Sequence, residues 1–333
     1  MKNNSVNFIF AVFVILFSSF VVFAQDDVLK VDTTLVKLNI GVVDVKGKPI
    51  LNLNKNDFTI YEDDTKQNIL RFEPTLAPFS VVVMLDMSGS TIGFRQTLTQ
   101  AALRFLDTLA PDDRVAVVAF SDKTELLIGF TSNRKEIAYA ISIAKGRGKT
   151  QLYKALDFSL DKLAKENTQR KAIVVLTDGV DSSLREQDRT VLNKITDENQ
   201  FATAIKPENN QTLNQILSFS DKQGVTIYPL ALPTGDPSKL PDPTPMQFAM
   251  YSAARERLNI LATRTGGRLN AIVRLEDMGR LYASVAAEIR TLYSVEYQST
   301  NDRPKSGEKF RTIKLEVNRP ELIARTRTGY YAK

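Results

Sequence analysis

The sequence contains no histidine, no cysteine and no tryptophan among its 333 residues. Without histidine there is no Ser-His-Asp triad, no imidazole general base, no proximal haem ligand and no histidine-bound zinc. Without cysteine there is no disulfide, thiolate nucleophile, iron–sulfur cluster or lipid-bearing N-terminal cysteine. The side chains left for chemistry carry oxygen, and Asp, Glu, Ser and Thr suit magnesium, calcium and manganese.

The charge balance gives no sign of a polyanionic partner. Lys and Arg number 44 against 38 Asp and Glu, which leaves a formal net charge of +6, and the two signs are interleaved along the chain. Dispersed charge is typical of a solvated surface, so we expect no nucleic-acid binding. With 43% hydrophobic and 25% charged residues, the composition predicts a globular protein with a substantial core.

The first 24 residues have the pattern of an export signal. Lys2 precedes an uncharged, mostly apolar run over residues 8–24, which ends at Ala24 before the polar Gln25. A short basic start, an apolar middle and a small final residue predict a secretory signal peptide at 1–24. The alternative is an uncleaved segment that anchors the protein in the membrane. In both cases we expect an exported protein that is periplasmic, on the cell surface or secreted.

Two kinds of hydrophobic pattern predict the fold. Near the chain ends, apolar and polar residues alternate at 36–42 and 293–297, which is typical of half-buried antiparallel strands. In the middle, continuous apolar runs predict parallel strands that are covered on both faces. These runs are residues 81–85, 115–120, 172–176 and 225–232. Leucine stripes at helical spacing lie between the runs, and we interpret them as core.

Strands that alternate with helices give right-handed crossovers and an open sheet. The predicted fold is α/β, with a doubly wound, mostly parallel sheet inserted in a small antiparallel β-sandwich that the N- and C-terminal flanks form together. The predicted boundaries are a signal peptide at 1–24, an N-terminal β part at 25–78, the α/β domain at 79–275, and a helix with the C-terminal β part at 276–333.

Oxygen-bearing side chains follow two of the predicted parallel strands. Asp86, Ser88 and Ser90 come directly after the first run, Asp178 follows the third, and Thr150 ends a glycine-containing loop before a helix. Ligands of open α/β sheets bind beyond the carboxyl ends of the strands, so we expect these five residues to meet there. Two carboxylates and three hydroxyls suit an octahedral Mg²⁺, with Mn²⁺ or Ca²⁺ as alternatives.

These five residues, in this order and on these elements, resemble the metal-ion-dependent adhesion site of von Willebrand factor type A domains. The resemblance extends over residues 80–273. It implies that Ser88, Ser90 and Thr150 coordinate the ion directly, and that Asp86 and Asp178 do so directly or through water. It also implies binding rather than catalysis. The flanking segments 58–63 and 328–331 are similar to a bacterial exported subgroup of these proteins.

Nearby residues have simpler interpretations. Asp86 or Asp178 alone would be interpreted as a helix or turn cap, and only the complete set indicates a metal. Asp181 and Asp188 fit no such pattern, so we expect them on the surface. The segments 182–210 and 233–245 both follow parallel strands. They are expected at the edge that carries the metal, either as a frame that selects the partner or without a role in binding.

The sequence therefore predicts an exported, metal-dependent protein-binding module for adhesion or assembly, and not an enzyme. A cation held mainly by hydroxyls stays electrophilic, so an open coordination position would favour an Asp or Glu of a partner protein. Two alternatives stay open. One is a metal-assisted hydrolase, which would need a carboxylate as its base. The other is a structural envelope subunit with a vestigial metal site.

Overall fold

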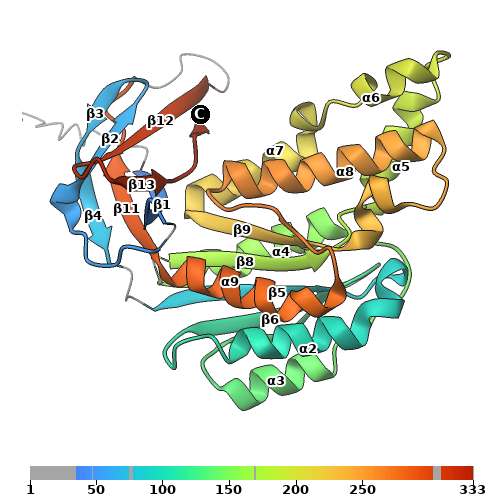
Figure 1. Ribbon diagram of the computed structural model, residues 1–333, viewed down its shortest axis with the longest axis horizontal. Helices are drawn as coiled ribbons and strands as arrows, with labels where there is room; N and C mark the ends of the chain where they lie inside the picture. Colours follow the sequence, from blue (N-terminus) through green and yellow to red (C-terminus); the bar gives the residue numbers. More distant parts are fainter. Residues whose placement is uncertain (1–34, 47, 75–77, 169, 303–308, 333) are drawn as a thin grey trace, which may run out of the picture. The chain divides into compact units, whose positions relative to one another are not determined.

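The computed structural model describes residues 35–46, 48–74, 78–168, 170–302 and 309–332 (Figure 1). The signal peptide predicted at 1–24 lies outside the described residues. Within the described ranges, no helix combines the length and the apolar character that crossing a membrane requires.

A six-stranded sheet forms the centre of the α/β part, with the strand order β10-β9-β8-β5-β6-β7. Its strands are β5 (Phe79–Asp86), β6 (Arg114–Phe120), β7 (Thr124–Thr131), β8 (Arg170–Thr177), β9 (Val225–Ala231) and β10 (Asn270–Ala271). All neighbours are parallel except β6 and β7. Every residue of β5, β8 and β9 is buried. The four apolar runs are β5, β6, β8 and β9, so the predicted sheet is confirmed.

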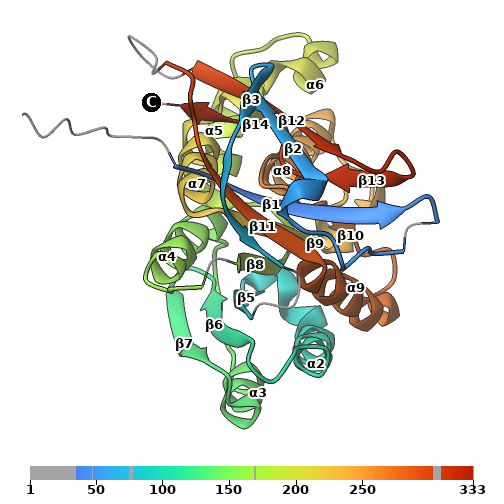
Figure 2. The same cartoon turned by 90° about the vertical axis from the view of Figure 1, so that its left-hand side faces the viewer.

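Helices cover both faces of this sheet (Figure 1, Figure 2). One layer contains α2 (Arg95–Leu106), α3 (Arg134–Ser142) and α9 (Met278–Arg290); the other contains α4 (Leu152–Ala164), α7 (Gln211–Gln223) and α8 (Pro245–Arg264). The predicted stripes face the sheet, and Leu98 on α2 and Leu156 on α4 are fully buried. Helix α9 packs on α2, where the rings of Phe105 and Tyr282 lie 5.4 Å apart.

Shorter elements complete the α/β part and its loops. Helices α5 (Ser182–Leu192) and α6 (Phe201–Ala204) both contact α8. Short 3-10 helices lie at Lys55–Asp57, Gly89–Phe94, Glu198–Gln200, Pro207–Asn209, Pro233–Gly235, Pro237–Lys239 and Leu275–Asp277. The segments that follow β8 and β9 are therefore largely helical rather than irregular loops.

The two ends of the chain build two antiparallel sheets together. Their orders are β13-β1-β11-β4 and β14-β12-β2-β3. The strands are β1 (Leu35–Asp44), β2 (Phe58–Glu62), β3 (Thr65–Gln67), β4 (Ile69–Glu73), β11 (Leu292–Gln298), β12 (Lys309–Val317), β13 (Leu322–Arg325) and β14 (Gly329–Ala332). Residues of both sheets share one apolar core, which includes Leu38, Ile60 and Tyr293. The predicted β-sandwich of both flanks is confirmed, while the exact domain limits stay predictions.

Polar contacts fasten the β-sandwich to the α/β part. On β1, Asn39 donates from Nδ2 to the carbonyl of Gly224 at 2.9 Å and to Oγ1 of Thr226 at 2.8 Å. Arg327, just before β14, forms a buried ion pair with Asp221 on α7. These contacts link the chain ends to the side of the sheet formed by α7 and β9.

We expect removal of residues 309–333, which contain β12, β13 and β14, to unfold β2 as well. In the register of the pair, Ile60 of β2 lies opposite Leu315 of β12, and Ile60 is fully buried. Without β12, the remaining β2–β3 hairpin has too few strands to be stable in water. Hydrogen exchange should show lost protection at 58–62, with β5 and β8 still protected. Unchanged protection at 58–62 would contradict a composite sandwich.

Candidate metal centre at the carboxyl edge of the sheet

Three loops carry the residues that the sequence singled out. Strand β5 ends at Asp86, and Ser88 and Ser90 follow in the next loop. Strand β8 ends immediately before Asp178. Because β5 and β8 are adjacent and parallel, both loops emerge at the same edge of the sheet. Thr150 lies in the third loop, just before α4.

The carboxylate of Asp86 is buried and held from two sides. Its Oδ1 accepts the backbone N–H of Ser88 at 3.0 Å, and its Oδ2 accepts the hydroxyl of Thr177 at 2.6 Å. The Thr177 hydroxyl in turn accepts the N–H of Gly179 at 3.0 Å. Thr177 therefore ties the end of β8 to the end of β5. Thr177 lies just beyond the predicted apolar run 172–176, so no sequence pattern singled it out.

The hydroxyls of Ser88 and Ser90 lie together beside the second carboxylate. Their Oγ atoms are 3.2 Å apart. Asp178 is buried, and its Oδ1 accepts the N–H of Val180 at 3.0 Å. A side-chain hydrogen bond from Ser90 also lowers the pKa of Asp178, against the effect of burial. Four of the five predicted ligands are thus brought together across two loops.

Burial raises the pKa of both carboxyl groups. At Asp86 burial is the larger cause and the negative charge of Asp178 is the second, and together they raise the pKa of Asp86 to about 7. Burial likewise raises the pKa of Asp178, although Arg185 and hydrogen bonds oppose it. Two neighbouring buried carboxylates are costly unless a proton or a cation neutralises them.

The donor set fits a hard divalent cation. In the described parts of the chain, no group of three or more acidic side chains is placed to hold a metal. An ion at this edge would therefore depend on Asp86 and Asp178 together with the hydroxyls of Ser88, Ser90 and Thr150. Carboxylate and hydroxyl oxygens completed by water suit Mg²⁺. The unneutralised charge of two buried carboxylates also favours a cation between them.

Thr150 is buried and held by the start of α5. Its N–H donates to Oγ of Ser182 at 3.1 Å, and its carbonyl accepts the N–H of Ser182 at 2.9 Å. The third loop also contacts the first, because the N–H of Gly89 donates to the carbonyl of Gly148 at 2.9 Å. No hydrogen bond among the described residues joins the Thr150 hydroxyl to the other four side chains. Its role as a ligand stays a prediction.

Arg95 is a positioning residue that the sequence analysis missed. Its Nη2 donates to the carbonyl of Met87 at 2.8 Å and to the carbonyl of Gly146 at 2.7 Å. It therefore fastens the first loop to the third. A basic residue at the first position of α2 is unfavourable for the helix dipole. That local conflict is the one sequence signal that could have identified Arg95.

The two acidic residues expected on the surface are buried, so that expectation was wrong. Asp181 caps α5, because its Oδ1 accepts the N–H groups of Ser183 at 2.9 Å and Leu184 at 3.1 Å. Asp188 forms a bidentate pair with Arg257 on α8, with distances of 2.6 and 2.8 Å. The partner lies 69 residues away in the sequence, so no local pattern could have shown the pairing.

The loop after β9 lies directly against Asp178. A Cβ built on Gly235 would be 1.9 Å from the carbonyl oxygen of Asp178. We expect Gly235→Ala to displace Asp178, to lower the free energy of unfolding by about 1–3 kcal/mol, and to weaken cation binding. Gly93→Ala is the control, because a Cβ there has nothing within 4 Å. Equal stability and cation affinity in the two variants would contradict this packing.

The sequence model of one protein family, described as von Willebrand factor type A domain, matches residues 81–180. This range runs from β5 through β8 to the loop after it and contains all five predicted ligands. An uncharacterized protein of Synechocystis is 35% identical over 106 residues, which are 31% of this chain and 25% of that protein. The human voltage-dependent calcium channel subunit alpha-2/delta-2 is 30% identical over 115 residues, 31% of this chain and 10% of the subunit.

Among solved structures, the von Willebrand factor domain of the type V pili tip protein Mfa5 from Porphyromonas gingivalis is similar. Its TM-score is 0.48 at 14% identity, with 64% of this chain and 95% of that chain covered. The family match supports a von Willebrand factor type A domain in the central part of the chain. The chain spans a quarter or less of the length of the two curated relatives, so their complete activities do not transfer to it.

Proposed function

We propose that this protein is an exported, metal-dependent protein-binding module for adhesion or assembly. One observation carries the proposal. Asp86 and Asp178 are buried as neighbours at the carboxyl edge of the sheet, with the hydroxyls of Ser88 and Ser90 beside them. The family match supports binding as the function, because von Willebrand factor type A domains generally mediate interactions between proteins.

The ligand types indicate what the partner would offer. Mg²⁺, Mn²⁺ or Ca²⁺ bound by hydroxyls and two partly shielded carboxylates would keep affinity for one more anionic oxygen. An Asp or Glu side chain of a partner protein provides that oxygen. This chain's own residues would hold the ion and exclude water from one side, while Thr177 and Arg95 keep the loops in place.

The rim of the site favours an acidic partner as well. Lys145, Arg147 and Lys149 are exposed on the loop that contacts Gly89. Within the described ranges none of the three forms an ion pair. Unpaired basic side chains beside a binding site steer acidic partners towards it and raise the association rate at low salt.

The predicted signal peptide at 1–24 supports export, and an uncleaved membrane anchor is the alternative. We therefore expect the partner in the cell envelope. A pull-down from envelope extract with wild type, Asp86→Asn and Asp161→Asn, each with Mg²⁺ and with a chelator, tests the proposal. Asp161 is exposed on α4 and controls for the loss of one charge. Wild type and Asp161→Asn should capture the same protein only with Mg²⁺. Capture that survives chelation or Asp86→Asn contradicts the proposal.

We expect cation binding to weaken as the pH falls below about 7. A proton competes with the cation for Asp86, whose pKa burial and Asp178 raise to about 7. Release of one proton per bound ion lowers the apparent affinity about tenfold per pH unit below that value. Calorimetric titrations with Mg²⁺ at pH 5.5, 6.5 and 8 measure this dependence. An affinity that is constant over this range would contradict a protonated Asp86 in the cation-free protein.

A further inference from the structure

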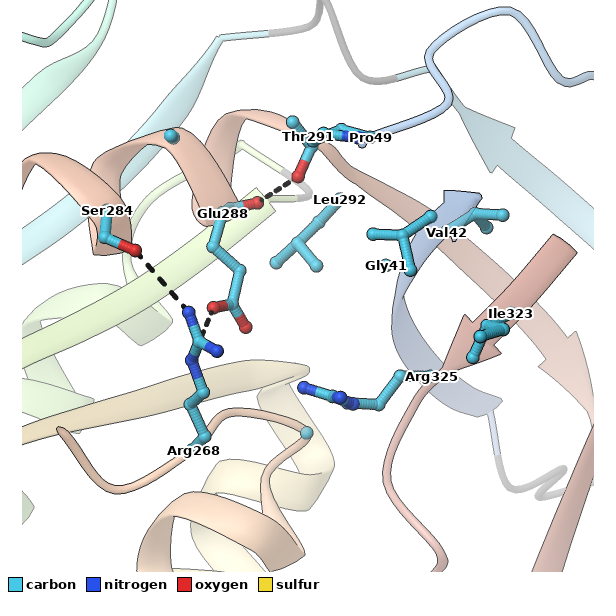
Figure 3. A pocket seen from close by; sticks show the side chains of 13 residues that line it. Gly41, Val42, Pro49, Arg268, Ser284, Glu288, Thr291, Leu292, Ile323 and Arg325 are labelled. Carbon is cyan, nitrogen blue, oxygen red and sulfur yellow. Dashed lines mark hydrogen bonds and ion pairs between the residues drawn. The ribbon is translucent and has the colours of Figure 1, made fainter. Parts of the chain in front are cut away.

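A hollow of about 320 Å³ lies between the β-sandwich and α9 (Figure 3). Strands β1 and β13 line one side, and the C-terminal half of α9 lines the other. The volume is at the lower end of the range for small-molecule sites in proteins. None of the five predicted metal ligands lines this hollow, so it is separate from the candidate metal centre.

A glycine keeps the hollow open. Gly41 on β1 lies opposite Arg325 of β13 in the strand register. Its φ is not positive, so the backbone does not require glycine there. Glycine within a strand costs about 0.5–1 kcal/mol relative to alanine. A Cβ at Gly41 would meet only Cδ2 of Leu292, at 3.4 Å. A larger side chain would extend into the hollow. The absence of a side chain at Gly41 therefore preserves the space, and backbone geometry does not explain the glycine.

One of the two arginines beside the hollow makes no close ion pair or side-chain hydrogen bond within the described residues. Across from β13, Nε of Arg268 pairs with Oε2 of Glu288 at 3.2 Å. Arg325 has no ion pair or side-chain hydrogen bond to any other described residue, and in Figure 3 its guanidinium extends towards Arg268 and Glu288. Burial raises the pKa of Glu288, and both arginines oppose that rise. With Glu288 ionised, the three groups carry one excess positive charge.

Apolar side chains line the same hollow, and Arg325 itself is exposed to solvent. Leu292, Pro49 and Ile323 line the hollow together with Arg325, and in Figure 3 Pro49 lies beside Thr291 rather than beside Arg325. Ile323 is 55% exposed, so its side chain is accessible to a ligand. A ligand that fits has one anionic end for the guanidinium fork and an apolar body for these side chains.

We propose that the hollow binds an apolar monocarboxylate, whose carboxylate pairs with Arg325 and whose apolar body contacts Leu292 and Ile323. A planar guanidinium binds a carboxylate through two parallel hydrogen bonds. A dianion such as a phosphate monoester fits less well, because Glu288 leaves an excess of only one positive charge. Two kinds of ligand carry such a carboxylate: a free branched acid, and the C-terminal residue of a polypeptide.

Calorimetric titration of the purified protein at pH 7.5 tests the proposal and separates the sources. The probes are 4-methylpentanoate and N-acetyl-leucine, each compared with its own amide. We expect each acid to bind at least tenfold more tightly than its amide, because a charge-assisted hydrogen bond is lost. Tighter binding of 4-methylpentanoate indicates a free acid, and tighter binding of N-acetyl-leucine indicates a chain terminus; both results support the carboxylate site.

Two variants and one control assign the binding to the hollow. Arg325→Gln should weaken binding of the acid at least tenfold, and Gly41→Val should abolish it by filling the space. Arg319→Gln is the control, because Arg319 is half-exposed, pairs with Asp57 and does not line the hollow. Circular dichroism verifies that each variant is folded. The proposal is overturned if the acids do not bind, if the amides bind equally, or if both hollow variants bind like wild type.

Discussion

Asp86→Asn is expected to abolish stabilisation by Mg²⁺ and, at the same time, to raise the melting temperature of the cation-free protein at pH 8. The two effects have the same origin. The ionised carboxylate is needed to hold the cation, but without a cation it is a buried charge next to Asp178. In wild type, a cation at 100 times its Kd should add about 2.7 kcal/mol to the free energy of unfolding. The variant should show none of this gain.

The sign of the second effect follows from the pKa. The pKa of Asp86 is raised from 3.8 to about 7 in the folded protein. A group with a raised folded-state pKa contributes stability that is complete below the unfolded value of 3.8 and is lost as the pH rises through about 7. At pH 8 the cation-free wild type has therefore lost that contribution. The neutral amide keeps the hydrogen-bonding side chain and removes the repulsion.

Thermal unfolding at pH 5 and pH 8, with a chelator and with Mg²⁺, separates these effects. Asp161→Asn is the matched control, because Asp161 is exposed on α4 and the charge change is the same. We expect the control to keep the Mg²⁺ effect and the wild-type pH dependence. If Asp86→Asn lowers the melting temperature of the cation-free protein at pH 8, the buried carboxylate is a structural cap and not a cation ligand.

Arg257→Met is expected to lower the free energy of unfolding by about 3–5 kcal/mol, because it leaves Asp188 buried without a counter-charge. Both side chains are almost completely buried, at 4% and 6% exposure. The pair joins α5 to α8, and α5 begins at Ser182, four residues after Asp178. Loss of the pair should therefore loosen one side of the metal centre as well.

Arg189→Met is the control, because Arg189 lies on α5, the helix that carries Asp188. Arg189 pairs with Glu186 at 3.3 Å, but the two side chains are 46% and 66% exposed. Exposed pairs contribute about 0–1 kcal/mol. The double variant Arg257→Met/Asp188→Leu should recover much of the loss, because no charge is left buried. Urea unfolding measures all three. Equal losses for Arg257→Met and Arg189→Met would show that the buried pair has no special role.

Most of the fold was predictable because its signals are local. Continuous apolar runs identified β5, β6, β8 and β9, and alternation identified β1 and β11. Elements with weak signals were missed, such as the two-residue β10 and the half-buried antiparallel β7. Their position depends on the neighbouring strand that they complete, not on their own residues.

From the sequence, only the proposed ligands of the candidate site could be singled out, and not the residues that hold their loops in place. Asp86 and Asp178 stand at strand ends, which sequence patterns locate well. Thr177, Arg95 and Gly235 act through contacts across the fold, with hydrogen-bond partners or close neighbours on other loops. Asp188 was assigned to the surface because burial of its partner, Arg257, cannot be seen from the sequence around either residue.

The most direct test of the metal centre is a crystal structure with Mn²⁺, in which anomalous scattering locates the ion. We predict one anomalous peak per chain at the carboxyl edge of the six-stranded sheet, within coordination distance of Ser88, Ser90 and Thr150 and near Asp86 and Asp178. Crystals grown at saturating Mn²⁺ that show no peak there, or a peak only elsewhere on the molecule, would contradict a metal centre at this edge of the sheet.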